Sequence, residues 1–192
     1  PLLKSYDDIS ENKEKICIGY KILANDKKEL GNYSLHFYSD KPNVIVHRSD
    51  DSRFEEDKTL NDYLSDFDLL LLIKLKYSYG EYEDSMIDSI KKHEINHIND
   101  HNDGNTGFRL TYTDNFSMMK QIENNRADYM IISQNEFEYF EKTSSENKSK
   151  LSFKKLKDIT TGNKRSLFCS KKVSQNEMDK INKSILKLVG VI

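Results

Sequence analysis

Apolar side chains recur along the chain in two spacings, which predict alternating strands and helices. Short apolar or alternating runs are typical of strands at residues 15–22, 43–48, 69–74, 108–112, 127–132 and 165–170. Spacings of three and four residues predict helices at 60–65, at 81–92, after Asp114, at 137–140 and at 175–189. Thr59 and Asp114 are typical helix N-caps. Because strands alternate with helices, we expect an α/β fold with a largely parallel sheet.

The composition fits a folded protein that carries no strong overall charge. Of the 192 residues, 36% are apolar, and 11 Tyr and 9 Phe supply bulky side chains for a core. The 30 basic and 32 acidic residues give a net charge of -2, which creates no field that would gather nucleic acid or anionic lipid. The longest apolar run, Leu69–Ile73, is far shorter than the roughly 20 residues of a membrane span. We expect one domain or two small lobes, no nucleic-acid partner and no membrane span in this stretch.

The start of the chain and its two cysteines bear on the cellular compartment of the protein. The sequence begins at Pro1 with no initiator Met and no signal segment, which indicates a processed or truncated product. Cys17 and Cys169 either form one disulfide or remain small buried residues, and both alternatives stay open. Two cysteines at this separation exclude a metal site made from cysteine alone.

One short stretch has the letters of a zinc-protease motif. His93, Glu94 and His97 match H-E-x-x-H, in which two histidines on one helical face bind zinc and the Glu activates water. His101 or Glu123 would supply a third ligand. So short a motif often arises by chance, and the match alone is weak evidence for a metalloenzyme.

The residues around this motif favour a solvated turn over a metal site. Asn and Asp crowd the region, and because both are poor helix formers, we expect the helix to end near Lys92 or His93. The longer metzincin pattern would need Gly at position 100 and His at position 103, where this chain has Asp100 and Asp103. A zinc hydrolase therefore remains a remote alternative, and we expect the purified protein to hold no zinc.

A run of segments, taken in order, resembles the type II periplasmic solute-binding proteins, in the family 3 group that includes amino-acid binders. Residues 17–20 (CIGY) resemble the strand of lobe I that ends in Gly before a ligand-contacting turn. Residues 37–42 (FYSDKP) resemble the aromatic-Ser-x-Pro stretch that leads into the first hinge strand, which would be 43–48. Each of these motifs is loose, and their order carries the resemblance.

Three further segments extend the resemblance to about residue 190. Residues 76–80 (KYSYG) lie where the family has a small polar turn at a helix N-terminus. Residues 124–132 (NNRADYMII) are similar to the family's R-x-D strand. Residues 165–171 followed by 176–188 look like the returning hinge strand and the terminal helix of lobe I.

The resemblance implies two α/β lobes, of which lobe I is incomplete. Lobe I would comprise residues 1–45 and 166–192, and lobe II residues 46–165, with hinges near 43–48 and 163–168. The strand, helix and strand that open lobe I in the family have no counterpart before Pro1. The implied architecture is a type II periplasmic-binding-protein fold without the first part of lobe I.

The resemblance also implies a ligand site without covalent chemistry. Two-lobed binders close around a ligand because the closed state makes extra contacts with it. The turn before the lobe II helix would offer unpaired backbone N–H groups and a helix dipole to an anion, although an ordinary N-cap is an equally fair interpretation. The ligand-binding residues that the resemblance implies are Tyr20, Lys21, Ser78, Tyr79, Gly80, Ser133 and Gln134.

Two departures from the family pattern argue against amino-acid ligands. Amino-acid binders hold the α-carboxylate with an Arg of lobe I and the α-ammonium with an acid at the end of the R-x-D strand. Here residues 24–29 contain no Arg, and Ser133 stands at the acidic position. A lysine does not replace the guanidinium fork, and a hydroxyl does not offset burial of an ammonium. Free α-amino acids should therefore bind poorly.

The sequence thus predicts an extracytoplasmic solute-binding protein or a sensor domain, not an enzyme, with no cofactor. Its partners would be a small-molecule ligand and a membrane transporter, of the ABC class, or a receptor. A binding-protein-like interaction module that has lost its ligand is the alternative from another class. The ligand, the oligomeric state and the choice between transport and sensing stay open.

Overall fold

The computed structural model describes residues 9, 11–22, 29–75, 77–100, 107–143 and 150–190, and for Tyr20 and residues 91–100 it describes the backbone alone. The chain forms two compact units. Unit 1 comprises Pro1–Asp40 with Asn163–Ile192, and unit 2 comprises Lys41–Gly162. Each unit has its own sheet and its own core, and each is described by itself below.

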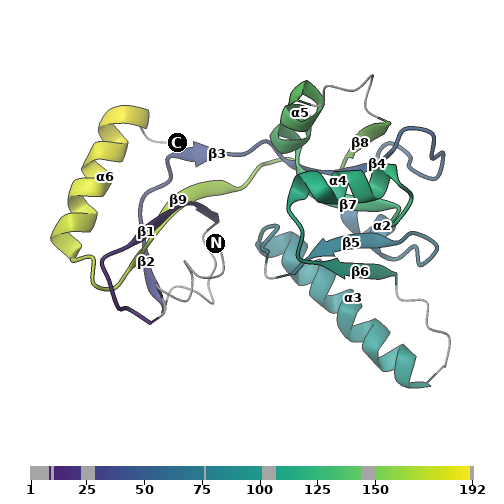
Figure 1. Cartoon of the computed structure of the whole chain (residues 1–192), viewed down its shortest axis with the longest axis horizontal. Coiled ribbons are helices and arrows are strands. Elements are labelled where there is room, and N and C mark those ends of the chain that lie inside the picture. The colour runs from purple at the N-terminus through teal and green to yellow at the C-terminus, as the bar shows by residue number, and fades with distance from the viewer. Residues whose placement is uncertain are drawn as a thin grey trace. The chain divides into compact units, whose positions relative to one another are not determined.

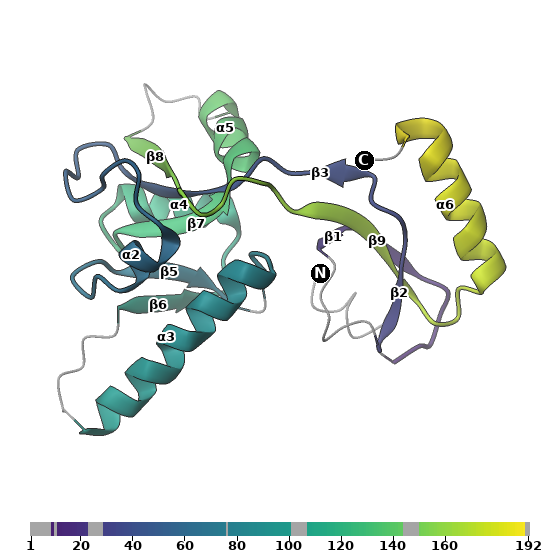
Figure 2. The same ribbon diagram turned by 180° about the vertical axis from the view of Figure 1, so that it is seen from behind.

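In unit 1, one long strand organises the sheet. Strand β9 (Lys164–Ser170) pairs antiparallel with β1 (Cys17–Ile22), β2 (Gly31–Tyr33) and β3 (Tyr38–Ser39). Helix α6 (Gln175–Val189) follows β9 (Figure 2). It begins with a capping box between Ser174 and Glu177. Met178 on α6 is buried with Cys169 and Val173, which anchors the helix to the strand.

The two cysteines are joined, and they lie directly opposite each other in this sheet. Cys17 on β1 pairs with Cys169 on β9 across the antiparallel ladder, and the two residues form a disulfide. Close packing continues on the other side of β9, where a Cβ on Gly31 would lie 2.8 Å from the ring of Phe168. Both cysteines belong to unit 1, and the structure decides between the two alternatives in favour of the bond.

The five-stranded sheet of unit 2 is only partly parallel. Its strand order is β6-β5-β7-β4-β8. Strand β5 runs parallel to β6 and β7, whereas β4 runs antiparallel to β7 and β8. The prediction of a largely parallel sheet was therefore wrong for β4, because only strands joined by a helical crossover are forced into the same direction. The bounds are Asn43–Arg48 for β4, Leu71–Lys74 for β5, Phe108–Thr111 for β6, Tyr129–Ser133 for β7 and Leu151–Lys155 for β8.

Helices cover both faces of this sheet (Figure 1). Helices α2 (Leu60–Leu64) and α3 (Glu81–Asp100) contribute to the core on one face, which also contains Ile45. Helices α4 (Asn115–Glu123) and α5 (Gln134–Thr143) contribute to the other, which contains Val44 and Val46. Alternate residues of β4 thus enter different cores, as the pleat of a strand requires.

Helix α3 is longer than the sequence predicts. It continues to Asp100, so the expectation that it ends near Lys92 or His93 was wrong. Asn and Asp each cost a helix less than about 0.7 kcal/mol relative to Ala, and no Gly or Pro interrupts the stretch from 81 to 100. His93 and His97 consequently lie one turn apart on a helix, not in a solvated turn.

Most predicted elements are present with small shifts at their ends, and the chain crosses between the units a few residues earlier than predicted. Strands β2, β3 and β8 were not predicted. The crossings are at Asp40–Lys41 and at Gly162–Asn163, not at 45–46 and 165–166. Residues 43–48 are an internal strand of unit 2, and 164–170 are the organising strand of unit 1, because each has ladder partners in its own unit. A hinge role for either crossing stays a prediction.

We predict that breaking the Cys17–Cys169 bond lowers the free energy of unfolding by about 2–4 kcal/mol, because the bond closes a loop of sequence separation 152 in the unfolded chain. Urea denaturation with and without dithiothreitol measures this loss. The double variant Cys17→Ser/Cys169→Ser should have the same free energy of unfolding as the reduced protein, and dithiothreitol should not change it. Two free thiols per chain in denatured, unreduced protein would contradict the bond itself.

Unit 2 also contains a buried histidine, His47, in which a second proton would have no hydrogen-bond acceptor among the described residues. His47 on β4 stacks on Phe54 with 4.3 Å between ring centroids, and its Nδ1 lies 2.7 Å from the carbonyl oxygen of Arg48. Nδ1 therefore donates, and Nε2, which has no partner among the described residues, carries no proton in the neutral ring. Burial lowers the pKa of His47, helped by the charges of Lys154 and Arg48 and opposed by the Arg48 carbonyl and Asp51.

We predict that His47 makes unit 2 less stable as the pH falls below about 6.5, the usual pKa of histidine. The unfolded chain binds the proton at that pH while the folded chain resists it, so stability is lost on the acid side. Thermal melts at pH 7.5 and pH 5 should show a smaller loss for His47→Gln than for the unchanged protein. His36→Gln serves as the comparison at a less buried ring. An equal acid loss in His47→Gln and the unchanged protein would contradict this role.

Candidate ligand-binding site

The carboxyl ends of the three parallel strands meet at one edge of the unit 2 sheet. Helices α3, α4 and α5 follow β5, β6 and β7 along the chain, so their N-termini lie near this edge (Figure 1). The first residue of β4, Asn43, also lies there, because it pairs with Ser133 at the end of β7. Open α/β sheets bind ligands outside the carboxyl ends of their strands, which makes this edge the candidate site in unit 2.

The turn before α3 already holds a carboxylate, which comes from the chain itself. Asp84 accepts a hydrogen bond from the Ser78 hydroxyl at 2.6 Å and another from the Tyr79 backbone N–H at 2.9 Å. Gly80 completes the turn with φ of 134°, a conformation that favours glycine. The expectation that this turn offers unpaired N–H groups was therefore wrong for Tyr79, because an acid one turn into the helix folds back onto it.

The side chain of Tyr79 belongs to the core. It is buried in the cluster that covers the α3 face of the sheet, and its hydroxyl accepts a hydrogen bond from the Lys74 backbone N–H at 2.9 Å. Burial raises the pKa of Tyr79, so the phenol stays protonated. The ring fixes the loop after β5, and any ligand contact by Tyr79 would have to come from its backbone.

Beneath this turn lies a buried polar cluster of Asn43, Glu83 and Ser133. The Asn43 side-chain N–H groups donate to the Tyr79 carbonyl at 2.7 Å and to Glu83 Oε1 at 2.6 Å. Glu83 is only 6% exposed, and burial raises its pKa. Ser133 is 3% exposed, and its hydroxyl has no hydrogen-bond partner among the described residues. Three polar side chains from β4, α3 and β7 are thus brought together at the strand ends.

A second polar chain connects the ends of β5, α4 and α5. Lys74 Nζ donates to Asn115 Oδ1 at 3.1 Å, and Asn115 Nδ2 donates to Glu136 Oε2 at 2.6 Å. The Lys74 ammonium also lies 5.2 Å from the centre of the Tyr77 ring. Lys74 therefore supplies a fixed positive charge at this edge.

The starts of α4 and α5 are satisfied by the chain as well. Asp114 caps α4 by accepting from the Ser117 N–H at 2.9 Å, as the sequence predicts. The Gln134 N–H donates to the Pro42 carbonyl at 3.0 Å, and its side-chain amide donates to Glu138 at 2.9 Å. Gln134 is only half-buried, which leaves part of it open to a ligand.

The remaining two predicted site residues belong to unit 1. Tyr20 and Lys21 lie on β1, where Lys21 is opposite Ser166 of β9 and is half-buried. The side chain of Tyr20 lies outside the described residues. The structure thus brings Ser78, Tyr79, Gly80, Ser133 and Gln134 together at one edge of unit 2, and a role for Tyr20 and Lys21 stays a prediction.

Sequence reasoning missed Asn43, Lys74, Glu83 and Asn115. A signal for Glu83 was present, because Glu83, Ile87 and Ile90 follow spacings of four and three and share one face of α3, on which both Ile residues are apolar. An acid within an apolar stripe indicates a buried carboxyl. The other three became visible only through their partners, which are distant in sequence.

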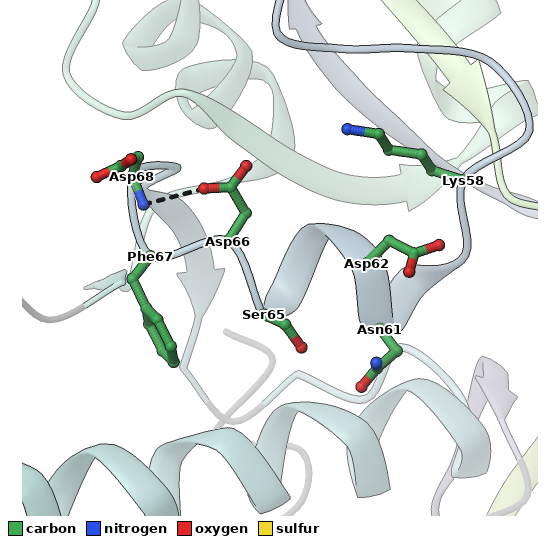
Figure 3. A pocket seen from close by; sticks show the side chains of 7 residues that line it. All are labelled: Lys58, Asn61, Asp62, Ser65, Asp66, Phe67 and Asp68. Atoms are coloured by element: carbon green, nitrogen blue, oxygen red, sulfur yellow. Dashed lines mark hydrogen bonds between the residues drawn. The ribbon is translucent and has the colours of Figure 1, made fainter.

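A wide hollow of about 640 Å³ lies elsewhere on unit 2 (Figure 3). Its walls come from α2 and the turn that follows, in which the Asp68 N–H donates to Asp66. This turn precedes β5, so the hollow lies toward the amino end of that strand, away from the polar edge. The residues that line it are Lys58, Asn61, Asp62, Ser65, Asp66, Phe67 and Asp68.

The zinc hypothesis is not tested by the described side chains. Among those side chains, no group of three or more His, Cys, Asp or Glu residues is arranged to hold a metal ion. The side chains of His93, Glu94 and His97 are not among them, and His101 lies outside the described residues.

Three solved structures to which this chain is similar are solute-binding proteins. An ancestral arginine-binding protein bound to arginine matches with a TM-score of 0.65 at 13% identity over 95% of this chain and 69% of its own. Holo ArgBP from T. maritima matches with a TM-score of 0.65 at 14% identity over 95% and 67%. The substrate-binding protein of an amino-acid ABC transporter matches with a TM-score of 0.61 at 11% identity over 96% and 70%. No protein-family model and no curated protein sequence matches the chain.

This chain has the type II periplasmic-binding-protein fold. The expected two-lobed α/β architecture is thereby confirmed, and the chain spans about 70% of the length of these binding proteins. At such low identity the likeness concerns the fold alone. Within the described residues, no helix has both the length and the apolar character needed to cross a bilayer.

We predict that Glu83→Gln stabilises the protein at pH 7. The pKa of Glu83 is raised in the fold, so its neutral form is favoured and stability is lost as the pH rises through that pKa. A glutamine keeps the acceptor for Asn43 without the charge. Urea denaturation should show the gain at pH 7 and its disappearance below about pH 4.5, the usual pKa of Glu. Glu81→Gln, on the exposed side of the same turn, should show no such gain.

Proposed function

We propose that this protein binds a small polar solute and that the carboxyl edge of the unit 2 sheet is its ligand-contacting surface in that unit. The observation that carries the proposal is the meeting of three helix starts with the buried Asn43, Glu83 and Ser133 cluster at that edge. Buried polar groups are nearly always hydrogen-bonded, so the unpartnered Ser133 hydroxyl indicates a position that a ligand or an ordered water completes. The fold supports the same conclusion, since the similar structures bind solutes.

The proposed role is binding, not catalysis. Ligand contacts alone shift a two-lobed protein between its conformations, and no bond needs to be made or broken. Ser78, Gly80, Ser133 and Gln134 are the proposed contacts in unit 2, with Tyr20 and Lys21 in unit 1. A transporter of the ABC class or a receptor would read out the bound state.

The disulfide supports a location outside the cytoplasm. Cytoplasmic thiol systems keep cysteines reduced, whereas disulfides persist in the periplasm and in extracellular space. The bond joins the exposed Cys17 to the fully buried Cys169 across the β1–β9 ladder, and neither cysteine is a free thiol. A periplasmic or extracytoplasmic location is therefore part of the proposal.

One observation favours a second candidate, an interaction module with the same fold and no ligand. Two donors at the start of α3, the Ser78 hydroxyl and the Tyr79 N–H, are satisfied by Asp84 in the absence of any ligand. A protein that uses the fold only as an interaction module would not require a ligand at this turn.

We predict that a thermal-shift screen of polar solutes finds at least one compound that raises the melting temperature, whereas the twenty free amino acids give no shift. A ligand at a hundred times its Kd stabilises by about 2.7 kcal/mol, or roughly 5–10 °C for a protein of this size. Calorimetry on the hit should show at least tenfold weaker binding for Gln134→Ala. Glu141→Ala, on the exposed side of α5, is the matched control.

Three outcomes of the screen lead to different conclusions. A hit that Gln134→Ala weakens supports the proposed surface. Micromolar binding of a free amino acid would show that the missing Arg and the Ser at position 133 do not prevent it. No hit across sugars, amines, peptides and organic acids would favour the interaction module.

A further inference from the structure

Asp84 occupies two hydrogen-bond donors at the start of α3 that would otherwise be open to an anion. The seat consists of the Ser78 hydroxyl and the Tyr79 N–H, both at the positive end of the twenty-residue helix α3. Such a pair of donors at a helix start is a general anion-binding arrangement. Here both oxygens of one carboxylate are used, Oδ2 by the hydroxyl and Oδ1 by the N–H.

A second observation connects this seat with a ligand. Ser133 pairs with Asn43 across the ladder, so both side chains lie on the same face of the sheet. The Asn43 amide bonds to the Tyr79 carbonyl, which places this face against the turn that forms the seat. The Ser133 hydroxyl is buried there without a partner among the described residues.

We propose that Asp84 acts as an internal carboxylate that excludes carboxylate ligands from this seat, so that the solute presents an uncharged or cationic group to unit 2. The proposal rests on the proposed function and specifies the class of its ligand. Asp84 is thereby a specificity-determining residue.

The charges around the seat act in the same direction. Glu83, the neighbour of Asp84, has its pKa raised first by burial and then by the charges of Asp84 and Asp158. A ligand carboxylate entering here would add another negative charge to this group while finding its two donors taken. An ammonium or amide N–H would instead meet carboxylate oxygens and the Ser133 hydroxyl as acceptors.

Asp84→Ala should open the seat to external anions. We expect acetate to raise the melting temperature of Asp84→Ala saturably, by roughly 2–4 °C, in excess of sodium chloride at equal ionic strength. Acetamide, which has the same shape and no charge, should act at least tenfold more weakly. The unchanged protein should respond to neither compound.

Two further variants make the test specific. Asp84→Asn keeps an acceptor in the seat, so it should fold and stay unresponsive to acetate. Glu177→Ala removes the matching carboxylate from α6, where Glu177 accepts from the N–H and hydroxyl of Ser174 at 2.9 and 2.8 Å in an exposed position. Water competes at that exposed seat, so acetate should give no more response than in the unchanged protein.

The outcomes separate this inference from the proposed function. Equal acetate responses in Asp84→Ala and the unchanged protein, or in Asp84→Ala and Glu177→Ala, would overturn the exclusion role of Asp84. The solute screen above depends on Gln134 and on unchanged protein, so its failure would leave the acetate result standing. A screen hit whose carboxylate is required for binding, and whose affinity Asp84→Ala leaves unchanged, would also overturn the inference.

Discussion

The antiparallel pairing of β4 with β7 is the constraint on which unit 2 depends. β4 pairs with β7 from Asn43 opposite Ser133 to His47 opposite Tyr129, and all but the last residue of β4 are buried. A shift of one residue would turn Ile45 out of one core and Val44 and Val46 out of the other. Both helical layers therefore depend on a single register. The same register places Ser133 beside Asn43. The Ser133 hydroxyl is buried and has no hydrogen-bond partner among the described residues.

Several hydrogen-bond donors at the carboxyl edge of the unit 2 sheet are satisfied by groups of the chain itself. Asp84, Asp114 and the Pro42 carbonyl take donors at the starts of α3, α4 and α5. Each cap is worth about 1 kcal/mol to its helix, and together they hold three loops in one arrangement without a ligand. A surface organised in advance loses little entropy on binding, but its own carboxylates restrict which groups it accepts. Stability of the edge and selectivity at the edge thus come from the same hydrogen bonds.

Unit 1 is organised by one strand, on which helix α6 packs. β9 pairs with β1, β2 and β3, and the disulfide joins β1 to it covalently. Its described core cluster is small and centres on Cys169, Val173 and Met178. A small core supplies little hydrophobic stabilisation, so a covalent link between directly opposed residues contributes proportionately more. This dependence connects the stability of unit 1 to an oxidising environment.

The sequence by itself determined the elements whose signals are local. The apolar run 43–48, the Asp114 cap and the spacing of 175–189 predicted β4, α4 and α6 closely, because periodicity and capping act within a few residues. The helix at 81–92 was predicted, but its end was placed too early, because weak propensities do not end a helix without Gly or Pro. The direction of β4, the partner of Cys17 and the clustering of Asn43 with Glu83 were decided only by the tertiary structure. Each of these joins segments far apart in the chain, and strand pairing and side-chain packing, which no local pattern encodes, bring them together.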